Sequence, residues 1–358
     1  MAGPPSVAPE PVLNKARHIN YWLRCLKTLL PTDYTSNDSN RMTLGFFIIS
    51  ALDVLGVLET HTKPEERREY IDWIYHCQHP EGGFRGFPAT DFGARRTAAN
   101  AQWDPANLPA TFFALATLIV LGDDLTRVRT RQCLAWLPTL QREEGSLGEM
   151  LGEGARIEGK RDMRFCYSAA AVRWILRGPR AETVADVPDL DVDAMVRFIN
   201  ASETYEHGFA EGPYREAHAG LTYCAVGTLS LLDRLASASL PASPPATEST
   251  TVGLTDPEST IRWLLSRQII QADDEGDESE DEEADNVPTD VPDLLHHADG
   301  VGCFPADFTA AGFNGRCNKD ADTCYAFWVS GSMAVGIRLL MDVEARIKAS
   351  MLTSSLRS

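Results

Sequence analysis

Short glycine turns recur along this chain of 358 residues at nearly constant steps. The first three, Gly82-Gly83-Phe84, Gly145-Ser146-Leu147 and Gly208-Phe209, follow one another at intervals of 63 residues. The fourth, Gly312-Phe313-Asn314, comes 104 residues after the third, and removing residues 271–311 would restore the step of 63. Equal steps with one insertion predict a repeat protein, in which each unit buries its apolar face against its neighbours.

An apolar segment follows each glycine turn, and one further apolar segment precedes them all. These segments are long for strands, rich in Ala and Leu, and lack strict alternation, so we expect buried helices. They span residues 39–56, 108–122, 162–178, 218–234 and 322–340. More amphipathic stretches lie between them and predict a second set of helices. These stretches are Glu66–His76, Leu125–Leu140, Val192–Ala201 and Glu258–Gln268.

A buried helix followed by an amphipathic helix, several times over, predicts stacked helical hairpins. If the hairpins close into a ring, the apolar helices line its inside and the amphipathic helices its outside. The sequence therefore predicts an all-α fold, an α/α toroid, with one domain where length alone would suggest two. We place the toroid domain at residues 17–340, after a disordered N-terminal tail at 1–16 and before an atypical tail at 341–358.

Acidic residues are concentrated in the insertion between the third and fourth turns. The chain has 33 Lys and Arg against 51 Asp and Glu, a formal net charge of −18. Residues 269–315 alone contain 14 acidic residues and no Lys or Arg, so the rest is close to neutral. We interpret residues 271–311 as an acidic disordered insertion, and the Ser- and Pro-rich stretch 236–257 as unstructured. The charge balance argues against a nucleic-acid partner.

The sequence also indicates where the protein resides. No apolar run reaches the roughly 20 residues of a transmembrane segment. The N-terminus, MAGPPSVAPEP, lacks the basic and apolar regions of a signal peptide. The eight cysteines are scattered without CxxC spacing, which indicates reduced thiols. We therefore expect a cytoplasmic protein.

The densest group of chemically active side chains lies in GFNGRCNKDADTCYAFW, residues 312–328. Two cations, Arg316 and Lys319, stand beside a carboxylate and a thiol, which suggests an anion site next to a metal site. Asp322 and Cys324 are of the residue types that bind zinc. They could share an ion if Asp322 caps a helix and Cys324 lies in its first turn. The alternative is a plain helix cap and a core thiol.

Three further side chains are candidates on weaker grounds. His218 opens the apolar segment 218–234, where the start of a helix attracts anions, although it could simply cap the helix. Arg164 opens the segment 162–178, and a charge facing a ring interior needs an ion-pair partner or an acidic ligand. Trp328 would by default pack in the core.

These motifs resemble those of a known family, the β subunits of protein prenyltransferases, and most nearly type I geranylgeranyltransferases of fungal type. Among the similar stretches are SNRMTLGFFIISALDVLG, GGFRG, LIVLGDDL, DMRFCY, EAHAGLTYC and NGRCNKDADTCYAFW. The resemblance runs from about Arg17 to about Leu340, apart from the insertion. It implies an α/α toroid that pairs with a helical-repeat α subunit in a heterodimer. The implied reaction transfers the lipid of geranylgeranyl diphosphate to the cysteine of CaaX motifs in small GTPases of Rho/Rac type.

The resemblance also implies roles for individual residues. It makes Asp322 and Cys324 ligands of a Zn²⁺ cofactor. Zinc lowers the pKa of a bound thiol, so the attacking group is a thiolate near neutral pH. The implied diphosphate-binding residues are His218, Arg316, Lys319 and Tyr325, of which Lys319 and Tyr325 also stabilise the leaving group. The implied contacts to lipid or peptide come from Arg164, Phe165 and Trp328.

Thr43 bears on which isoprenoid is transferred. It stands where the farnesyltransferases of the family carry a bulky Trp, and its smaller side chain leaves room for a longer, C20 lipid. CaaX sequences ending in Leu or Phe would then be the acceptors.

The family has a third zinc ligand, a histidine in a His-x-Tyr motif after one more glycine turn, and this sequence lacks it. The chain ends in VEARIKASMLTSSLRS, and none of the eight histidines falls in the matching place. We interpret the chain as a truncated gene model or a folded isoform without activity. Three other interpretations stay open: a farnesyltransferase β subunit, the β subunit that modifies Rab proteins, and a non-catalytic toroid that binds a lipid diphosphate or the α subunit.

Overall fold

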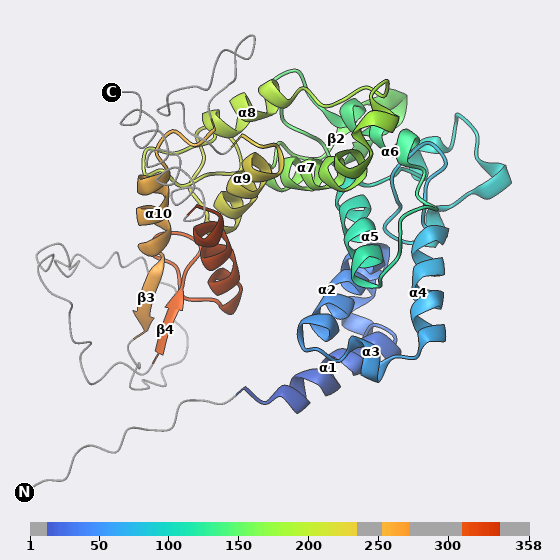
Figure 1. The fold of residues 1–358 in the computed structure, drawn as a ribbon, viewed down its shortest axis with the longest axis horizontal. Coiled ribbons are helices and arrows are strands. Elements are labelled where there is room, and N and C mark those ends of the chain that lie inside the picture. Colours follow the sequence, from blue (N-terminus) through green and yellow to red (C-terminus); the bar gives the residue numbers. More distant parts are fainter. Residues whose placement is uncertain (1–12, 235–252, 272–309, 337–358) are drawn as a thin grey trace, which may run out of the picture.

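The computed structural model describes residues 13–234, 253–271 and 310–336. Within them the chain forms an arc of helical hairpins (Figure 1). The inner side of the arc is lined by α2 (Arg41–Val54), α5 (Leu108–Val120), α7 (Met163–Arg177), α9 (Ala219–Leu231) and a helix at 323–336. The outer side carries α4 (Pro64–His76), α6 (Thr130–Trp136), α8 (Val192–Ala201) and α10 (Pro257–Leu265). The predicted alternation of inner apolar and outer amphipathic helices is confirmed.

The remaining elements are short. The helix α1 (Lys15–Lys27) packs on α2 at one end of the arc, and α3 (Leu58–His61) follows α2. Two antiparallel pairs of strands join β1 (Met150–Leu151) to β2 (Ile157–Glu158) and β3 (Gln268–Gln271) to β4 (Ala310–Phe313). The 3₁₀ helices are Thr32–Asn40, Pro88–Thr90, Gly93–Arg95, Ala101–Trp103, Leu137–Leu140, Glu153–Ala155 and Gly178–Val184. Within the described ranges, no helix is both long enough and apolar enough to cross a membrane.

The repeat is visible in the backbone of each turn. Phe84, Leu147 and Phe209 form antiparallel bridges to residues that follow an outer helix within a few positions, and Phe313 pairs in the same way with Gln268 after α10. The turn needs a left-handed residue, which is Gly82 (φ +118°) in the first repeat and Gly145 (φ +101°) in the second. In the third repeat His207 (φ +66°) takes this position. The structural step from Leu147 to Phe209 is therefore 62 residues, one fewer than the glycines alone predicted.

Hydroxyl groups of the inner helices hold these turns in place. The Oγ1 atoms of Thr111 in α5 and Thr222 in α9 accept hydrogen bonds of 2.9 Å from the backbone N–H groups of Phe84 and Phe209. Both phenylalanine side chains are fully buried, and most of the inner-helix core joins them in one continuous apolar cluster. The turns at Phe84 and Phe209 are thus tied to the start of the inner helices that follow them.

Several predicted boundaries are wrong by a few residues. Helix α1 begins at Lys15, inside the expected 1–16 tail, because Asn14 caps it through Oδ1. Gln271, Ala310 and Ala311 belong to strands β3 and β4, so the two ends of the expected insertion are paired backbone. The helix predicted at Leu125–Leu140 is shorter in the structure. Leu125 has a left-handed backbone (φ +60°), and α6 starts only at Thr130. Residues 1–12, 235–252, 272–309 and 337–358 lie outside the described part, and with them most of both predicted tails and the acidic insertion.

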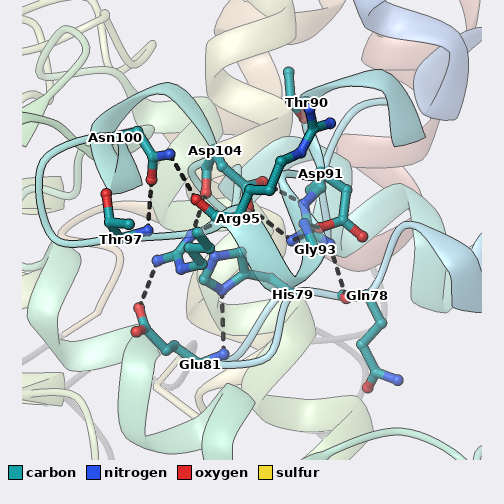
Figure 2. Close-up of polar contacts among 12 residues, drawn as sticks. Gln78, His79, Glu81, Thr90, Asp91, Gly93, Arg95, Thr97, Asn100 and Asp104 are labelled. Atoms are coloured by element: carbon teal, nitrogen blue, oxygen red, sulfur yellow. Dashed lines mark hydrogen bonds and ion pairs between the residues drawn. The ribbon is translucent and has the colours of Figure 1, made fainter.

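A buried ion network fixes the long connection between the first turn and α5 (Figure 2). Asp104 has no exposed surface and accepts hydrogen bonds from Arg85 Nη2 at 2.9 Å and from Arg96 Nη1 at 3.1 Å. Arg85, itself 2% exposed, also donates to the carbonyl oxygen of Gln78 at 3.0 Å. Because both partners are removed from water together, breaking the pair would leave a buried charge uncompensated. The network therefore pins residues 86–106 to the end of α4.

Candidate functional site

The site is built on the first residues of the inner helices. Asn107, Asp162 and His218 are the N-caps of α5, α7 and α9, and Asp322 immediately precedes the helix at 323–336. Each side chain accepts a hydrogen bond from a backbone N–H in the first turn of its helix. For three of the four, the cap's own N–H donates to the turn residue Phe84, Phe209 or Phe313. The repeat therefore supplies one equivalent position per unit, and two of these positions are Asp322 and His218.

His218 and Tyr325 meet across two repeats. The Tyr325 hydroxyl oxygen lies 3.2 Å from His218 Nε2, and the two rings pack edge to face with centroids 5.5 Å apart. His218 Nδ1 accepts the N–H of Gly220 at 3.0 Å, so its proton belongs on Nε2, which donates to the tyrosine. Burial, and then Arg316 and Arg164, lower the pKa of His218 and favour this neutral form. The Tyr325 O–H thus remains free to donate to a ligand.

Asp322 and Cys324 lie side by side at the start of the last inner helix. Asp322 Oδ1 accepts the backbone N–H of Cys324 at 2.8 Å, which is the cap geometry that sharing one ion requires. The Cys324 side chain also hydrogen-bonds the carboxylate and lowers the pKa of Asp322. Partial burial and then the carboxylate raise the pKa of the Cys324 thiol. Both residues are exposed, and within the described ranges no third His, Cys, Asp or Glu joins them.

The two cations of the segment lie in the loop 314–322. Arg316 Nη1 donates to Oε2 of Glu216 at 3.2 Å, and Glu216 lies two residues before His218. The Lys319 side chain is exposed, and its carbonyl oxygen accepts the Asn314 side-chain N–H at 3.0 Å. The carbonyl oxygen of Gly315 accepts the N–H of Ala219 at 2.9 Å, which ties this loop to the start of α9. The structure therefore brings Arg316 and Tyr325 together with His218, and Lys319 lies in the same loop.

Arg164 is ion-paired rather than free. Its guanidinium makes a forked contact with its own helix cap, from Nε to Asp162 Oδ1 at 2.9 Å and from Nη2 to Asp162 Oδ2 at 2.5 Å. The Arg164 side chain is nevertheless 68% exposed, whereas the Asp162 carboxylate that it pairs with is only 2% exposed. The neighbouring Phe165 is half-buried against the main core.

A belt of aromatic rings crosses the inner helices, and the sequence reasoning missed it. Successive rings in the belt lie with centroids between 4.9 and 6.3 Å apart. The belt consists of Phe46 and Phe47 on α2, Phe112 and Phe113 on α5, Tyr167 on α7, Tyr223 on α9, and Phe327 and Trp328. The available signal was an aromatic residue five positions after each cap: Phe112, Tyr167, Tyr223 and Phe327.

Two predicted residues lie on the helices that carry the opposite ends of the belt. Trp328 packs edge to face on Tyr223, 5.1 Å between centroids, beside the His218–Tyr325 pair. Thr43 is half-buried on α2, one turn before Phe46, and so lies at the far end of the arc from the helix 323–336 (Figure 1). Thr43 is therefore separated by α5 and α7 from the polar cluster, by which we mean His218, Arg316, Lys319 and Tyr325.

Known proteins are similar to this chain in sequence and in fold. The family described as the prenyltransferase alpha-alpha toroid domain matches residues 13–352. The geranylgeranyl transferase type-1 subunit beta of Dictyostelium discoideum is 28% identical over 90% of this chain and 76% of its own length. The subunit of the same name from Arabidopsis thaliana is 28% identical over 96% and 77%. The protein farnesyltransferase subunit beta of Arabidopsis thaliana is 24% identical over 88% of this chain and 48% of its own length.

A solved structure has the same architecture. A chain of Candida albicans protein geranylgeranyltransferase-I complexed with GGPP superposes with a TM-score of 0.64, at 23% identity, over 93% of this chain and 80% of that one. At this identity the likeness establishes the fold. Together with the family match over most of the sequence, it shows that this chain belongs to the prenyltransferase alpha-alpha toroid family.

Proposed function

We propose that this chain is the β subunit of a type I protein geranylgeranyltransferase. It pairs with an α subunit and transfers the lipid of geranylgeranyl diphosphate to the cysteine thiol of C-terminal CaaX motifs in small GTPases of Rho/Rac type. The two relatives named geranylgeranyl transferase type-1 subunit beta support this choice, since they match more of both chains than the farnesyltransferase subunit does. We assign the activity to the cytoplasm, as expected from the sequence.

The observation that carries the proposal is the polar cluster at one end of an aromatic belt. A lipid diphosphate has an anionic head and a long apolar tail, and it needs both kinds of surface in one continuous site. Arg316, Lys319 and the free O–H of Tyr325 suit the head, while His218 fixes the tyrosine. The belt from Trp328 to Phe46 suits the tail.

These polar groups also suit the transition state. As the substrate sulfur forms its bond to C1 of the lipid, the bond from C1 to the diphosphate oxygen breaks and negative charge grows on the leaving group. Hydrogen-bond donors and cations already in place stabilise that charge without having to reorient. Arg316 and Lys319 supply the cations, and the Tyr325 hydroxyl supplies the neutral donor.

Asp322 and Cys324 would hold the zinc ion. The cap contact, in which Asp322 Oδ1 accepts the backbone N–H of Cys324 at 2.8 Å, supports this assignment because it keeps two residues of zinc-binding type together. Zinc, when bound, holds the substrate thiol as a thiolate near neutral pH. Catalytic zinc sites have three protein ligands, and the described ranges supply two.

Thr43 would set the length of the lipid. It lies beside the Phe46 end of the belt, the end opposite the polar cluster, where the tail of a long isoprenoid must finish. A small side chain there leaves room for a fourth isoprene unit. Arg164, Phe165 and Trp328 then border the part of the site shared by lipid and peptide.

Transfer by the heterodimer tests the proposal. The chain is co-expressed with an α subunit and given labelled geranylgeranyl or farnesyl diphosphate with a CaaX peptide ending in Leu. We expect geranylgeranyl transfer at least about tenfold faster than farnesyl transfer, because one pocket contact is worth that much discrimination. Stoichiometric binding of the diphosphate without turnover would instead favour the non-catalytic toroid, and faster farnesyl transfer would favour a farnesyltransferase.

A further inference from the structure

Arg267 is a buried cation that no carboxylate of the described residues neutralises. It follows α10, is 6% exposed and stacks over the ring of Trp263 with its Cζ 5.0 Å from the centroid. Its Nε has no hydrogen-bond partner, and Nη2 donates to the Ser266 hydroxyl at 3.2 Å. Across residues 13–234, 253–271 and 310–336 no carboxylate forms an ion pair with it. A buried charge of this kind favours an anion at its remaining donors.

The remaining donor of Arg267 points at a cysteine. Arg267 Nη1 lies 3.2 Å from Sγ of Cys317, an exposed residue in the loop 314–322. Reactive cysteines in proteins lie in partly exposed, electropositive surroundings. The thiol therefore combines exposure to solvent with a cation held rigidly behind it.

The other described cysteines lack this combination. Burial raises the pKa of Cys77, Cys133, Cys166 and Cys224 to about 12. Cys324 is exposed, but it has the Asp322 carboxylate beside it, and its pKa is raised. Cys25 is half-buried on α1, and no guanidinium donates to it among the described residues.

We propose that Cys317 is a site of reversible thiol modification, at which small disulfides such as glutathione disulfide form a mixed disulfide with the protein. The Cys317 sulfur, as a thiolate, attacks one sulfur of the disulfide. The S–S bond of the reagent breaks, a new S–S bond to Cys317 forms, and the other half leaves as a thiolate that takes a proton from water. The reagent is the oxidant, so the exchange needs no further electron acceptor.

The modification has a consequence that rests on the proposed function. A glutathionyl group brings carboxylates to the residue next to Arg316, one of the cations assigned to the diphosphate. It would occupy the approach to the head-group site and repel an anionic ligand. We therefore expect the modified heterodimer to show a higher KM for geranylgeranyl diphosphate, with recovery when a reducing agent removes the adduct.

The test measures the rate at which the mixed disulfide forms at Cys317, in addition to the transfer activity. The zinc-loaded heterodimer is exposed to limiting glutathione disulfide, and the modified peptides are quantified by mass spectrometry over time. We expect the peptide with Cys317 to be modified first, and Arg267→Gln to slow its modification roughly tenfold. Arg267→Lys keeps a cation there and should retain most of the rate. Cys25→Ser is the matched control and should change neither the Cys317 rate nor the KM.

The outcomes separate this proposal from the proposed function. If Cys317 reacts no faster than Cys25, or if Arg267→Gln leaves its rate unchanged while the protein keeps its melting temperature, the proposal is wrong. If Cys317 reacts as expected but the heterodimer transfers no lipid, the modification site stands and the proposed function fails. If glutathione disulfide raises the KM for geranylgeranyl diphosphate in the wild type but not in Cys317→Ser, modification of Cys317 is what weakens binding of the diphosphate.

Discussion

Gly315 lies so close against the ring of Tyr325 that a Cβ at residue 315 would overlap the phenol. The carbonyl of Gly315 also accepts the N–H of Ala219, which fixes this approach from the side of α9. The missing side chain therefore lets Tyr325 reach His218, and we call Gly315 a positioning residue for the tyrosine.

Gly315→Ala should displace the Tyr325 ring and lower kcat/KM for geranylgeranyl transfer by up to about 100-fold, since small misplacements cost that much. Steady-state kinetics of the heterodimer measure this. Gly178→Ala is the control, because nothing lies within 4 Å of a Cβ there and the backbone is already helical. An unchanged kcat/KM in Gly315→Ala would show that the position of Tyr325 does not matter.

Tyr325→Phe should keep the packing and remove the O–H that we assign to the leaving group. We expect kcat to fall about 10- to 100-fold, somewhat less than for a fully buried oxyanion donor. Single-turnover measurements with saturating diphosphate isolate this effect from binding. Tyr205→Phe is the control. It removes a surface hydroxyl that donates to Glu206, and it should retain full activity.

Asp322→Asn and Cys324→Ser should each reduce bound zinc well below one ion per heterodimer, because removing a ligand from a small set weakens zinc strongly. Metal analysis after dialysis measures this, and a chelator should abolish transfer in the wild type. Cys317→Ser, five residues before Asp322, should keep its zinc. Full occupancy in both ligand variants would refute the assignment.

Thr43→Trp should shorten the space for the lipid and shift preference toward farnesyl diphosphate. We expect the ratio of kcat/KM for the two diphosphates to change by about tenfold or more, within the range for filling a pocket. Competition between the two labelled diphosphates gives the ratio directly. Val54→Trp, at the exposed end of the same helix, should leave the ratio unchanged.

His79 should make the stability of the fold depend on pH. Burial, and then Arg96 and Arg85, lower the pKa of His79 to about 4, and its side chain is 3% exposed. The unfolded chain binds this proton below its ordinary pKa of about 6.5, whereas the folded protein does so only near 4. The contribution of neutral His79 to the free energy of unfolding is therefore complete above pH 6.5. It is lost as pH falls toward 4, and the total loss is about 3 kcal/mol.

Urea unfolding at pH 7.5 and pH 5 checks this term. His79→Asn keeps an acceptor for the Glu81 N–H, which His79 Nδ1 accepts at 3.2 Å, and removes the titrating ring. This variant should lose less stability between the two pH values than the wild type. His76→Asn, on the exposed end of α4, should behave like the wild type. Equal losses in wild type and His79→Asn would contradict the assignment.

The helices were predictable because their apolar faces are long and regular. The stretch Val192–Ala201 has its predicted limits, and the other inner and outer helices differ from prediction by a few residues, mostly at ends where a cap or a proline decides. The glycine step failed by one residue at the third turn, since His207 rather than glycine is left-handed there. A periodicity of residue types cannot show that a histidine has taken a conformation that usually needs glycine.

The site was less predictable than the fold. The motif around residues 316–325 singled out the segment, but pairing His218 with Tyr325 depends on the stacking of repeats 107 residues apart. The forked contact between Arg164 and Asp162 could have been expected, since a capping carboxylate lies two positions before an arginine. The sequence could not decide whether Arg164 pairs with this carboxylate or binds an acidic ligand, and the structure shows the ion pair. The aromatic belt was not predicted because its rings form a continuous series only between helices, which a single segment of sequence does not show.

The four caps have a consequence for how such a site can originate. Asn107, Asp162, His218 and Asp322 all satisfy the start of a helix, so the backbone tolerates an amide, a carboxylate or an imidazole there. Duplication of one hairpin would copy this tolerance into every repeat, and each copy could then diverge without loss of the fold. Chemistry could thus be acquired by exchanging one cap at a time, which separates the evolution of activity from the evolution of stability.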